Sequence, residues 1–150
     1  MSSDADLIKL YSKRILALAA DMPLTDPLEA PDVSVKKRAP LCGSTVTVSL
    51  NVADGHITAF SQNVKACALG QASAALMARH VVGRSQAEIE AGRDALRAFL
   101  AGEGNGPDLP WTGYDVLTPA RDYRNRHASI MLAFEATADA LAEANASACA

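Results

Sequence analysis

The sequence has no long apolar run, no basic N-terminal stretch and only three cysteines. No segment approaches the roughly 18 consecutive apolar residues that a membrane-spanning helix needs, so we expect no membrane partner. Residues 1–6 carry acidic side chains where an export signal would carry basic ones, which favours a cytoplasmic protein. Three cysteines in a chain without an export signal do not indicate a disulfide framework.

An excess of positive charge is also missing. The 14 lysines and arginines are outnumbered by 17 aspartates and glutamates, which gives a formal net charge of −3. Nucleic acid is therefore not expected as the main partner, because phosphate binding depends on clustered positive charge. Two small basic groups do occur, at residues 36–38 and at Arg121, Arg124 and Arg126. We interpret them as solvated surface charge, with a docking surface for an acidic partner or an acidic peptide tail as the alternative.

The hydrophobic patterns that are present predict an α+β fold. Apolar and polar residues alternate over residues 45–52, which is typical of a half-buried strand, and Asp54-Gly55 is a strong signal for a hairpin turn. Strands are predicted over residues 33–38, 45–52 and 56–64, and helices over 6–22, 68–82, 125–143 and from the capping box of Ser85 and Glu88 to Gly102. This order indicates a small three-stranded antiparallel sheet packed against about five helices. We expect a single domain over residues 1–150, with its core at about 7–141 and a flexible tail at 144–150.

Two of the cysteines stand at the ends of predicted elements. Cys42 lies just before a strand, Cys67 lies just before a helix, and a predicted hairpin joins them. Backbone N–H groups at strand and helix ends stabilise negatively charged sulfur, so two thiolates could share one metal or sulfur site there. The alternative is that both are small buried hydrophobic residues, as free cysteines commonly are. Cys149, in the small and polar tail, is expected to take no part.

Five segments, in order along the chain, carry a resemblance to a known family. They are Leu10-Tyr11, Ala39-Pro40-Leu41-Cys42-Gly43, Asp54-Gly55-His56-Ile57, Cys67 with Ala72-Ser73-Ala74, and Gly83-Arg84-Ser85. From about residue 7 to residue 141 the chain resembles the NifU-type iron–sulfur cluster scaffold proteins, which include the IscU and SufU kinds.

The resemblance implies a SufE/NifU-like fold and a role as a scaffold or carrier rather than an enzyme. It also implies a [2Fe-2S] cluster, iron or a Zn²⁺ ion held near the surface by three cysteines and an aspartate, since these metals favour thiolate ligands. The implied partners are a cysteine desulfurase, which supplies sulfur, and iron–sulfur acceptor proteins, which receive the cluster.

Two of the implied ligand positions carry hydroxyl groups in this sequence. Ser44 stands where the family has aspartate, and an ungapped alignment puts Ser129 at the position of the third cysteine. The same alignment places His127 one residue before the family's histidine, so a one-residue slip at the helix start would bring it to the site. The predicted ligands are therefore Cys42, Cys67 and His127, with Ser44 and Ser129 as weak ligands. The alternative for His127 is a surface or helix-terminal histidine.

Two thiolates and one imidazole suit Zn²⁺, whereas a [2Fe-2S] cluster normally needs four protein ligands. A homodimer that pools two cysteine pairs would supply four. The remaining candidates have structural interpretations: His56 and His80 as structural or exposed, and Trp111 and Tyr114 as packing residues. Residues 117–121 only echo the chaperone-recognition motif of the IscU kind, so no chaperone handoff is expected.

Three functional hypotheses follow. The first is a scaffold or carrier in iron–sulfur cluster assembly that binds iron, a [2Fe-2S] cluster or Zn²⁺ through Cys42 and Cys67. The second is a NifU-like interaction protein that has lost cluster binding and docks on or regulates a cysteine desulfurase, which the loss of two expected ligands favours. The third is a thiol-dependent enzyme with Cys67 as its nucleophile, and it is the weakest because the sequence supplies no convincing oxyanion site or orienting acid.

Overall fold

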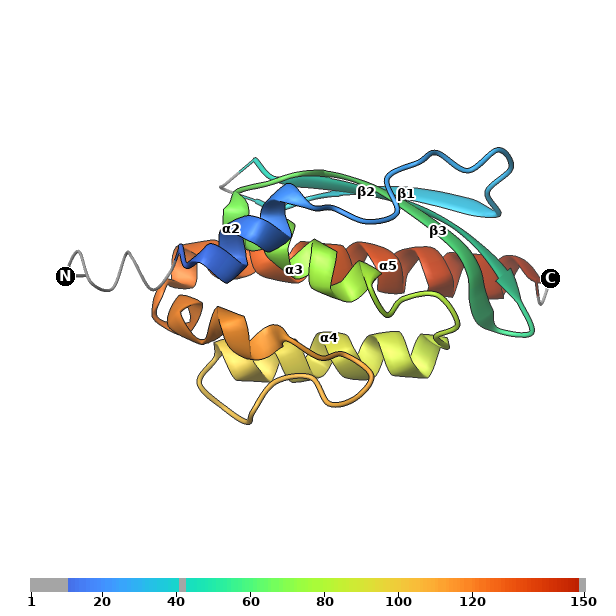
Figure 1. Ribbon diagram of the computed structural model, residues 1–150. Coiled ribbons are helices and arrows are strands. Elements are labelled where there is room, and N and C mark those ends of the chain that lie inside the picture. Colours follow the sequence, from blue (N-terminus) through green and yellow to red (C-terminus); the bar gives the residue numbers. More distant parts are fainter. Residues whose placement is uncertain (1–10, 41–42, 149–150) are drawn as a thin grey trace.

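The computed structural model describes residues 11–40 and 43–148, in which one helix is followed by three strands and then by further helices, the order expected of an α+β fold (Figure 1). The strands are β1 (Val33–Arg38), β2 (Thr45–Ala53) and β3 (His56–Lys65). The α-helices in the described residues are α2 (Lys13–Ala20), α3 (Ala68–Ala78), α4 (Gln86–Leu100) and α5 (His127–Ala148). Two 3₁₀ segments, η1 (Tyr114–Asp122) and η2 (Arg124–Arg126), precede α5.

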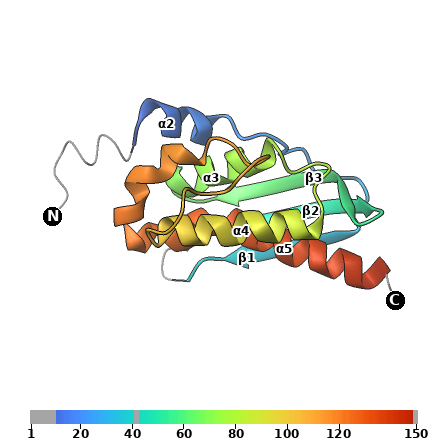
Figure 2. The same ribbon diagram turned by 90° about the horizontal axis from the view of Figure 1, so that it is seen from below.

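The three strands form one antiparallel sheet in the order β1-β2-β3, as the sequence predicts. Helix α5 lies against the inner face of this sheet, where Val46, Val48 and Leu50 of β2 are buried. Figures 1 and 2 show the layers: the sheet, then α3 and α5, then α4 on the side of α5 away from the sheet. The core therefore lies between the sheet and the helices, and the predicted fold class is confirmed.

The strand predictions agree closely with the structure. The bounds of β1 are those expected, while β2 and β3 each end one residue later than expected. Asp54 and Gly55 form the turn between β2 and β3 with positive φ angles of 53° and 78°. A two-residue hairpin turn with both residues in the left-handed region favours this Asp-Gly pair.

The predicted end of α3 is wrong by several residues. The helix ends at Ala78 rather than at residue 82. Beyond it the chain turns to bond with β3: the Gly83 N–H donates to the Ile57 carbonyl (2.7 Å), and the Ile57 N–H donates to the Arg84 carbonyl (3.0 Å). These bonds to the sheet edge take the place of further helical turns, and Gly83, with a φ of 92°, allows the change of direction.

The last helix was expected over residues 125–143, but α5 begins at His127 and continues to Ala148. Part of the segment that was predicted to be a flexible tail is therefore helical. Ala144 is buried, and the Asn145 side-chain amide donates to the side-chain oxygen of Gln86 on α4 (2.9 Å). This contact between helices anchors the end of α5. The prediction for Cys149 lies outside the described residues.

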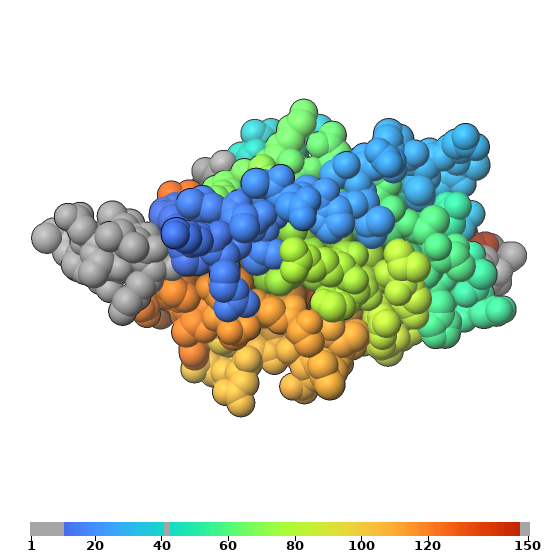
Figure 3. Space-filling view, viewed as in Figure 1, coloured from blue at the N-terminus to red at the C-terminus, as the bar shows by residue number. Residues whose placement is uncertain are grey.

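Helix α2 covers only part of the first predicted helix, and residues 1–10 lie outside the described residues. Ser12 caps it by accepting the Ile15 N–H on its side-chain oxygen (3.3 Å). Ile15 and Leu18 are buried, and α2 packs against α3. The space-filling view shows the blue segment of α2 and the following loop lying along the surface beside α3 (Figure 3). None of the described helices combines the length and apolar character needed to cross a membrane.

Trp111 and Tyr114 pack in the core, as predicted. Both are buried, and the Trp111 ring meets Phe134 of α5 edge-on with 5.0 Å between ring centroids. The Tyr114 ring lies 5.8 Å from the same phenylalanine. Burial raises the pKa of the Tyr114 hydroxyl, which donates to the Ser73 carbonyl (2.9 Å). These aromatic contacts attach the segment before α5 to the helices.

The predicted capping box at the start of α4 is present, and it makes stability depend on pH. The Ser85 N–H donates to Glu88 (3.1 Å), and the Arg84 guanidinium lies 3.1 Å from the same carboxylate. The backbone bond from Ser85, together with Arg84, lowers the pKa of Glu88 below its ordinary value of 4.5. Because the folded pKa is lowered, the stabilisation is present above the ordinary pKa and is lost as pH falls through the folded pKa.

We therefore expect Glu88→Gln to be less stable than the wild type at neutral pH, with a difference that shrinks as pH falls below about 4.5. Glutamine keeps the capping hydrogen bond and removes only the charge. Urea denaturation of both proteins across this pH range measures the difference. A difference that does not change with pH would contradict the assignment.

Candidate functional site

Cys67 stands at the junction between β3 and α3. Its backbone is extended (φ −66°, ψ 169°), and it is the capping residue of α3, although its side chain makes no capping bond. The Cys67 carbonyl accepts the Gln71 N–H (2.9 Å), and the Gln71 side-chain amide donates to the Ala66 carbonyl (3.2 Å). These bonds fix the turn that presents the thiol, which is half-buried.

Two buried hydroxyl groups accompany the Cys67 thiol. The Ser129 side-chain oxygen, in the first turn of α5, lies 3.6 Å from the Cys67 Sγ. The same oxygen lies 3.1 Å from the side-chain oxygen of Ser44, which immediately precedes β2. Both serines are buried. The β1–β2 connection, the start of α3 and the start of α5 thus meet at one end of the molecule, on the left in Figure 1.

The close approach of α3 to α5 brings Cys67 and Ser129 together. A Cβ built on Gly70 would lie 2.9 Å from the Ala66 Cβ and 3.1 Å from the Ser129 carbonyl oxygen, and nearer still to the Ser129 Oγ. Real Cβ atoms essentially never come within 3.0 Å of another atom, so Ala66 and the Ser129 side chain would have to shift. Only glycine at position 70 therefore lets the first turn of α5 rest directly on the first turn of α3.

A second contact holds the two helices one turn further along. The buried Ser73 hydroxyl of α3 donates to the Ile130 carbonyl of α5 (2.7 Å). The Ser73 carbonyl in turn accepts the Tyr114 hydroxyl. A buried hydroxyl that loses its partner costs about 1–3 kcal/mol, so these bonds resist sliding of one helix along the other. The separation of Cys67 from Ser129 is thereby fixed by the core and not by surface loops.

His127 is two residues from Ser129, but its ring has a different partner. The His127 Nε2 donates to the Ala120 carbonyl (2.9 Å), because a carbonyl oxygen can only accept. His127 also lines an open cavity of about 960 Å³, together with Arg121 and other residues from the end of α4 and from η1–η2. Cys67 is not among the residues that line this cavity. Nε2 could bind a metal only if the ring turned away from Ala120, so the role of His127 as a ligand stays a prediction.

The other two histidines make local contacts. The His56 Nδ1 lies 2.9 Å from the Asp54 carbonyl in the hairpin turn. The His80 Nε2 lies 3.2 Å from the Thr112 side-chain oxygen, and burial, with the positive charges of Arg84 and Arg79, lowers the pKa of His80. These contacts agree with the structural interpretation of both residues.

The described part of the site offers one thiol and two hydroxyls. Within residues 11–40 and 43–148, no three or more histidine, cysteine, aspartate or glutamate side chains come together as a metal site would require. Cys42, the other predicted thiolate, lies outside the described residues. Neutral hydroxyls are much weaker ligands for iron or zinc than thiolates, so the described groups alone do not complete a metal site.

Comparison with solved structures identifies the family. A nitrogen-fixing NifU-like protein (N-terminal) from Brucella abortus has 42% sequence identity and a TM-score of 0.90, over 94% of this chain and 98% of that one. The chain belongs to the NifU-like family. No protein-family model matches the chain, and no curated protein matches it.

Two more distant structures share the fold of this NifU-like chain. One is described as a candidate iron–sulfur cluster assembly scaffold protein for the SUF system from Fervidobacterium islandicum AW-1, with 18% identity and a TM-score of 0.78. The other is a hypothetical protein with 19% identity and a TM-score of 0.79. In both cases the match covers 89% of this chain and 98% of the other. At this level of identity the likeness shows the fold alone.

The geometry agrees with the ungapped alignment of this chain to the NifU-type pattern. The alignment puts Ser129 at one ligand position, and Ser44 follows Cys-Gly at another; in the structure the Ser129 hydroxyl lies beside the Cys67 thiol, and the Ser44 hydroxyl lies beside that of Ser129. The predicted one-residue slip would bring His127 to the position of Ala128, where the family has its histidine, and this role of His127 stays a prediction. Sequence reasoning missed Gly70, although a glycine in the first turn of a predicted helix is a signal for close packing.

The contact of Gly70 with Ser129 can be tested by a double-mutant cycle. We expect Gly70→Ala to lower the free energy of unfolding by about 1–3 kcal/mol, because the added methyl group overlaps Ser129. Ser129→Ala alone should cost about 1 kcal/mol through the lost hydrogen bond. The double variant should cost less than the sum, since removing the Ser129 Oγ makes room for the methyl group. Urea denaturation measures all three, and additive costs would show that the two side chains do not touch.

Proposed function

We propose that this NifU-like protein acts in iron–sulfur cluster assembly, as a scaffold or carrier that binds iron, a [2Fe-2S] cluster or Zn²⁺ through Cys42 and Cys67. The observation that supports this most is the half-buried Cys67 thiol beside Ser129 and Ser44, in a chain with 42% identity to a NifU-like N-terminal domain. In this role the metal and the sulfur are cargo, and the protein is not an enzyme.

With these donor groups, the protein would bind its metal or cluster cargo weakly. Cys42 and Cys67 supply two thiolates, whereas a [2Fe-2S] cluster normally has four protein ligands. The hydroxyls of Ser44 and Ser129 add little while they stay protonated. A partner protein, a second copy of the chain, or His127 after its ring leaves Ala120 would complete the coordination. Weak holding suits a protein that must pass its cargo on.

The proposed partners follow from the same chemistry. A cysteine desulfurase would deliver sulfur to Cys67, which is the capping residue of α3, at the helix end where the first backbone N–H groups have no partner within the helix. Iron–sulfur acceptor proteins would then receive the cluster.

Anaerobic reconstitution with iron and sulfide tests the proposal. We expect the wild type to take up iron with visible absorbance, and Cys42→Ala and Cys67→Ala to lose it because each removes one of two thiolates. Cys149→Ala is the matched control and should behave as the wild type. No uptake of iron or zinc by the wild type would contradict the proposal.

A variant with stronger ligands at positions 44 and 129 tests whether the two serines cause the weak binding. Ser44→Asp combined with Ser129→Cys replaces the two hydroxyls by a carboxylate and a thiol, with position 129 beside Cys67 and position 44 beside position 129. We expect the reconstituted cluster of this variant to survive a chelator at least about tenfold longer than that of the wild type, since both new groups are stronger ligands. Equal lifetimes would mean that these two positions do not face the cargo.

The second candidate function is an interaction protein that has lost cluster binding and docks on or regulates a cysteine desulfurase. The hydrogen bond between Ser44 and Ser129 favours it, because each hydroxyl has a partner without any metal. On this hypothesis, desulfurase binding measured by titration is unchanged in the double variant Cys42→Ala with Cys67→Ala, and the wild type takes up no metal. Metal uptake by the wild type would count against it.

A further inference from the structure

Three basic side chains share one face of the sheet, at the end where Cys67 lies. Arg38 of β1 is paired with Thr45 of β2, and Thr45 is paired with Lys65 of β3. Lys36 lies two residues from Arg38 and is in the next row, paired with Thr47. Because residues paired across a sheet or two apart on a strand point to the same side, all three cations lie on one face. We call Lys36, Arg38 and Lys65 the basic face.

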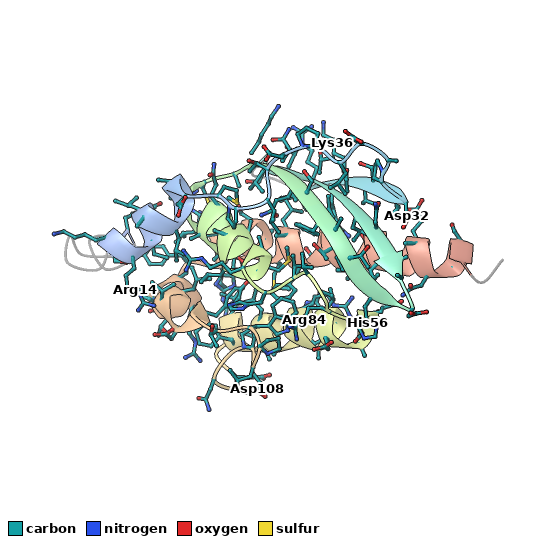
Figure 4. The ribbon with its side chains drawn as sticks, turned by 45° about the vertical axis from the view of Figure 1, so that its right-hand side comes forward. Arg14, Asp32, Lys36, His56, Arg84 and Asp108 are labelled. Atoms are coloured by element: carbon teal, nitrogen blue, oxygen red, sulfur yellow. The ribbon has the colours of Figure 1, made fainter. Side chains whose placement is uncertain are left out.

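The neighbouring residue Lys37 shows which face this is. Lys37 is paired with the buried Val46, and its Nζ forms an ion pair with Asp139 of α5 at 2.7 Å. Lys37 therefore points to the helices, and the basic face points away from them. Lys36, Arg38 and Lys65 are exposed, and Figure 4 shows Lys36 on the outer side of the sheet.

The basic face has no acidic counterpart among the residues that the structure describes. Arg84, Arg93 and Arg97 each form an ion pair within the described residues, but Lys36, Arg38 and Lys65 do not. Asp26 and Glu29, exposed on the loop after α2, form no ion pair with them either. Three unneutralised cations on one small surface favour an anionic partner.

The basic face adjoins the thiol site. The Arg38 guanidinium lies 3.9 Å from where a Cβ on Gly43 would stand, next to Ser44 in the chain. Lys65 is the last residue of β3, two residues before Cys67. A partner that covers the basic face would therefore also reach the end of the molecule that carries Cys67. The half-buried threonines Thr45 and Thr47 lie between the cations and add hydroxyl donors for carboxylates.

We propose that the basic face docks an acidic surface of the partner protein that delivers sulfur to Cys67; the identity of that partner as a cysteine desulfurase rests on the proposed function. Charge complementarity speeds the encounter and sets the orientation, so that Cys67 faces the partner's reactive group. The arginine and the two lysines act through long-range attraction and surface ion pairs, whose strength falls with ionic strength.

Two probes separate the docking surface from the identity of the partner. The full chain is titrated with a short polyglutamate peptide and with a cysteine desulfurase, at low and at physiological salt. The test variant carries Lys36→Gln, Arg38→Gln and Lys65→Gln, and the matched control is Lys37→Gln, which removes a cation from the opposite face. Thermal melting of each variant monitors folding, which exposed substitutions should leave unchanged.

We expect the triple variant to bind both probes at least about tenfold more weakly at low salt, with a smaller loss at physiological salt. Lys37→Gln should stay within about twofold of the wild type. Binding of polyglutamate through the basic face without binding of the desulfurase would support the surface and count against the proposed function. Equal binding of polyglutamate by the wild type and the triple variant would overturn the proposal. So would tighter binding of a single-stranded oligonucleotide than of polyglutamate.

Discussion

The close approach of α3 and α5 at Gly70 is the constraint on which the site depends. Cys67 and Ser129 are far apart in the sequence, and they become neighbours because the first turns of the two helices touch where position 70 has no side chain. The Ser73–Ile130 bond holds this packing within the core. Ser44 then joins through its contact with Ser129, so one helix contact assembles groups from three segments of the chain.

The serine hydroxyls of this site are hydrogen-bonded within the protein, and the described site offers few strong ligands for a metal. Its two serine hydroxyls bond to each other, so the fold needs no ion to pair its buried polar groups at this point. In the proposed role, hydroxyls in place of stronger ligands would favour temporary holding of cargo over permanent binding. The basic face beside the site adds a way to orient a partner, because its charges are open to solvent while those of Lys37 and Asp139 are paired with each other.

Local signals in the sequence predicted much of this structure. Alternation located β2, the Asp-Gly turn placed the hairpin that leads into β3, and the capping box placed α4. The ungapped alignment put Ser129 at the family's third cysteine position, and in the structure its hydroxyl lies 3.6 Å from the Cys67 thiol. The ends of α3 and α5 could not be predicted, because they depend on bonds to distant segments: Gly83 to β3, and Asn145 to Gln86. The preference of His127 for the Ala120 carbonyl is likewise a tertiary contact that no local pattern reveals.

We infer that Cys67 belongs to a site that carries metal or sulfur, although two family ligand positions hold hydroxyls. The most direct measurement is the iron, zinc and acid-labile sulfide content of the protein purified without oxygen, compared with Cys67→Ala purified in the same way. We predict bound iron or zinc in the wild type and its loss in the variant. Wild-type protein that is free of metal and sulfide, or a variant that retains them in full, would contradict the claim.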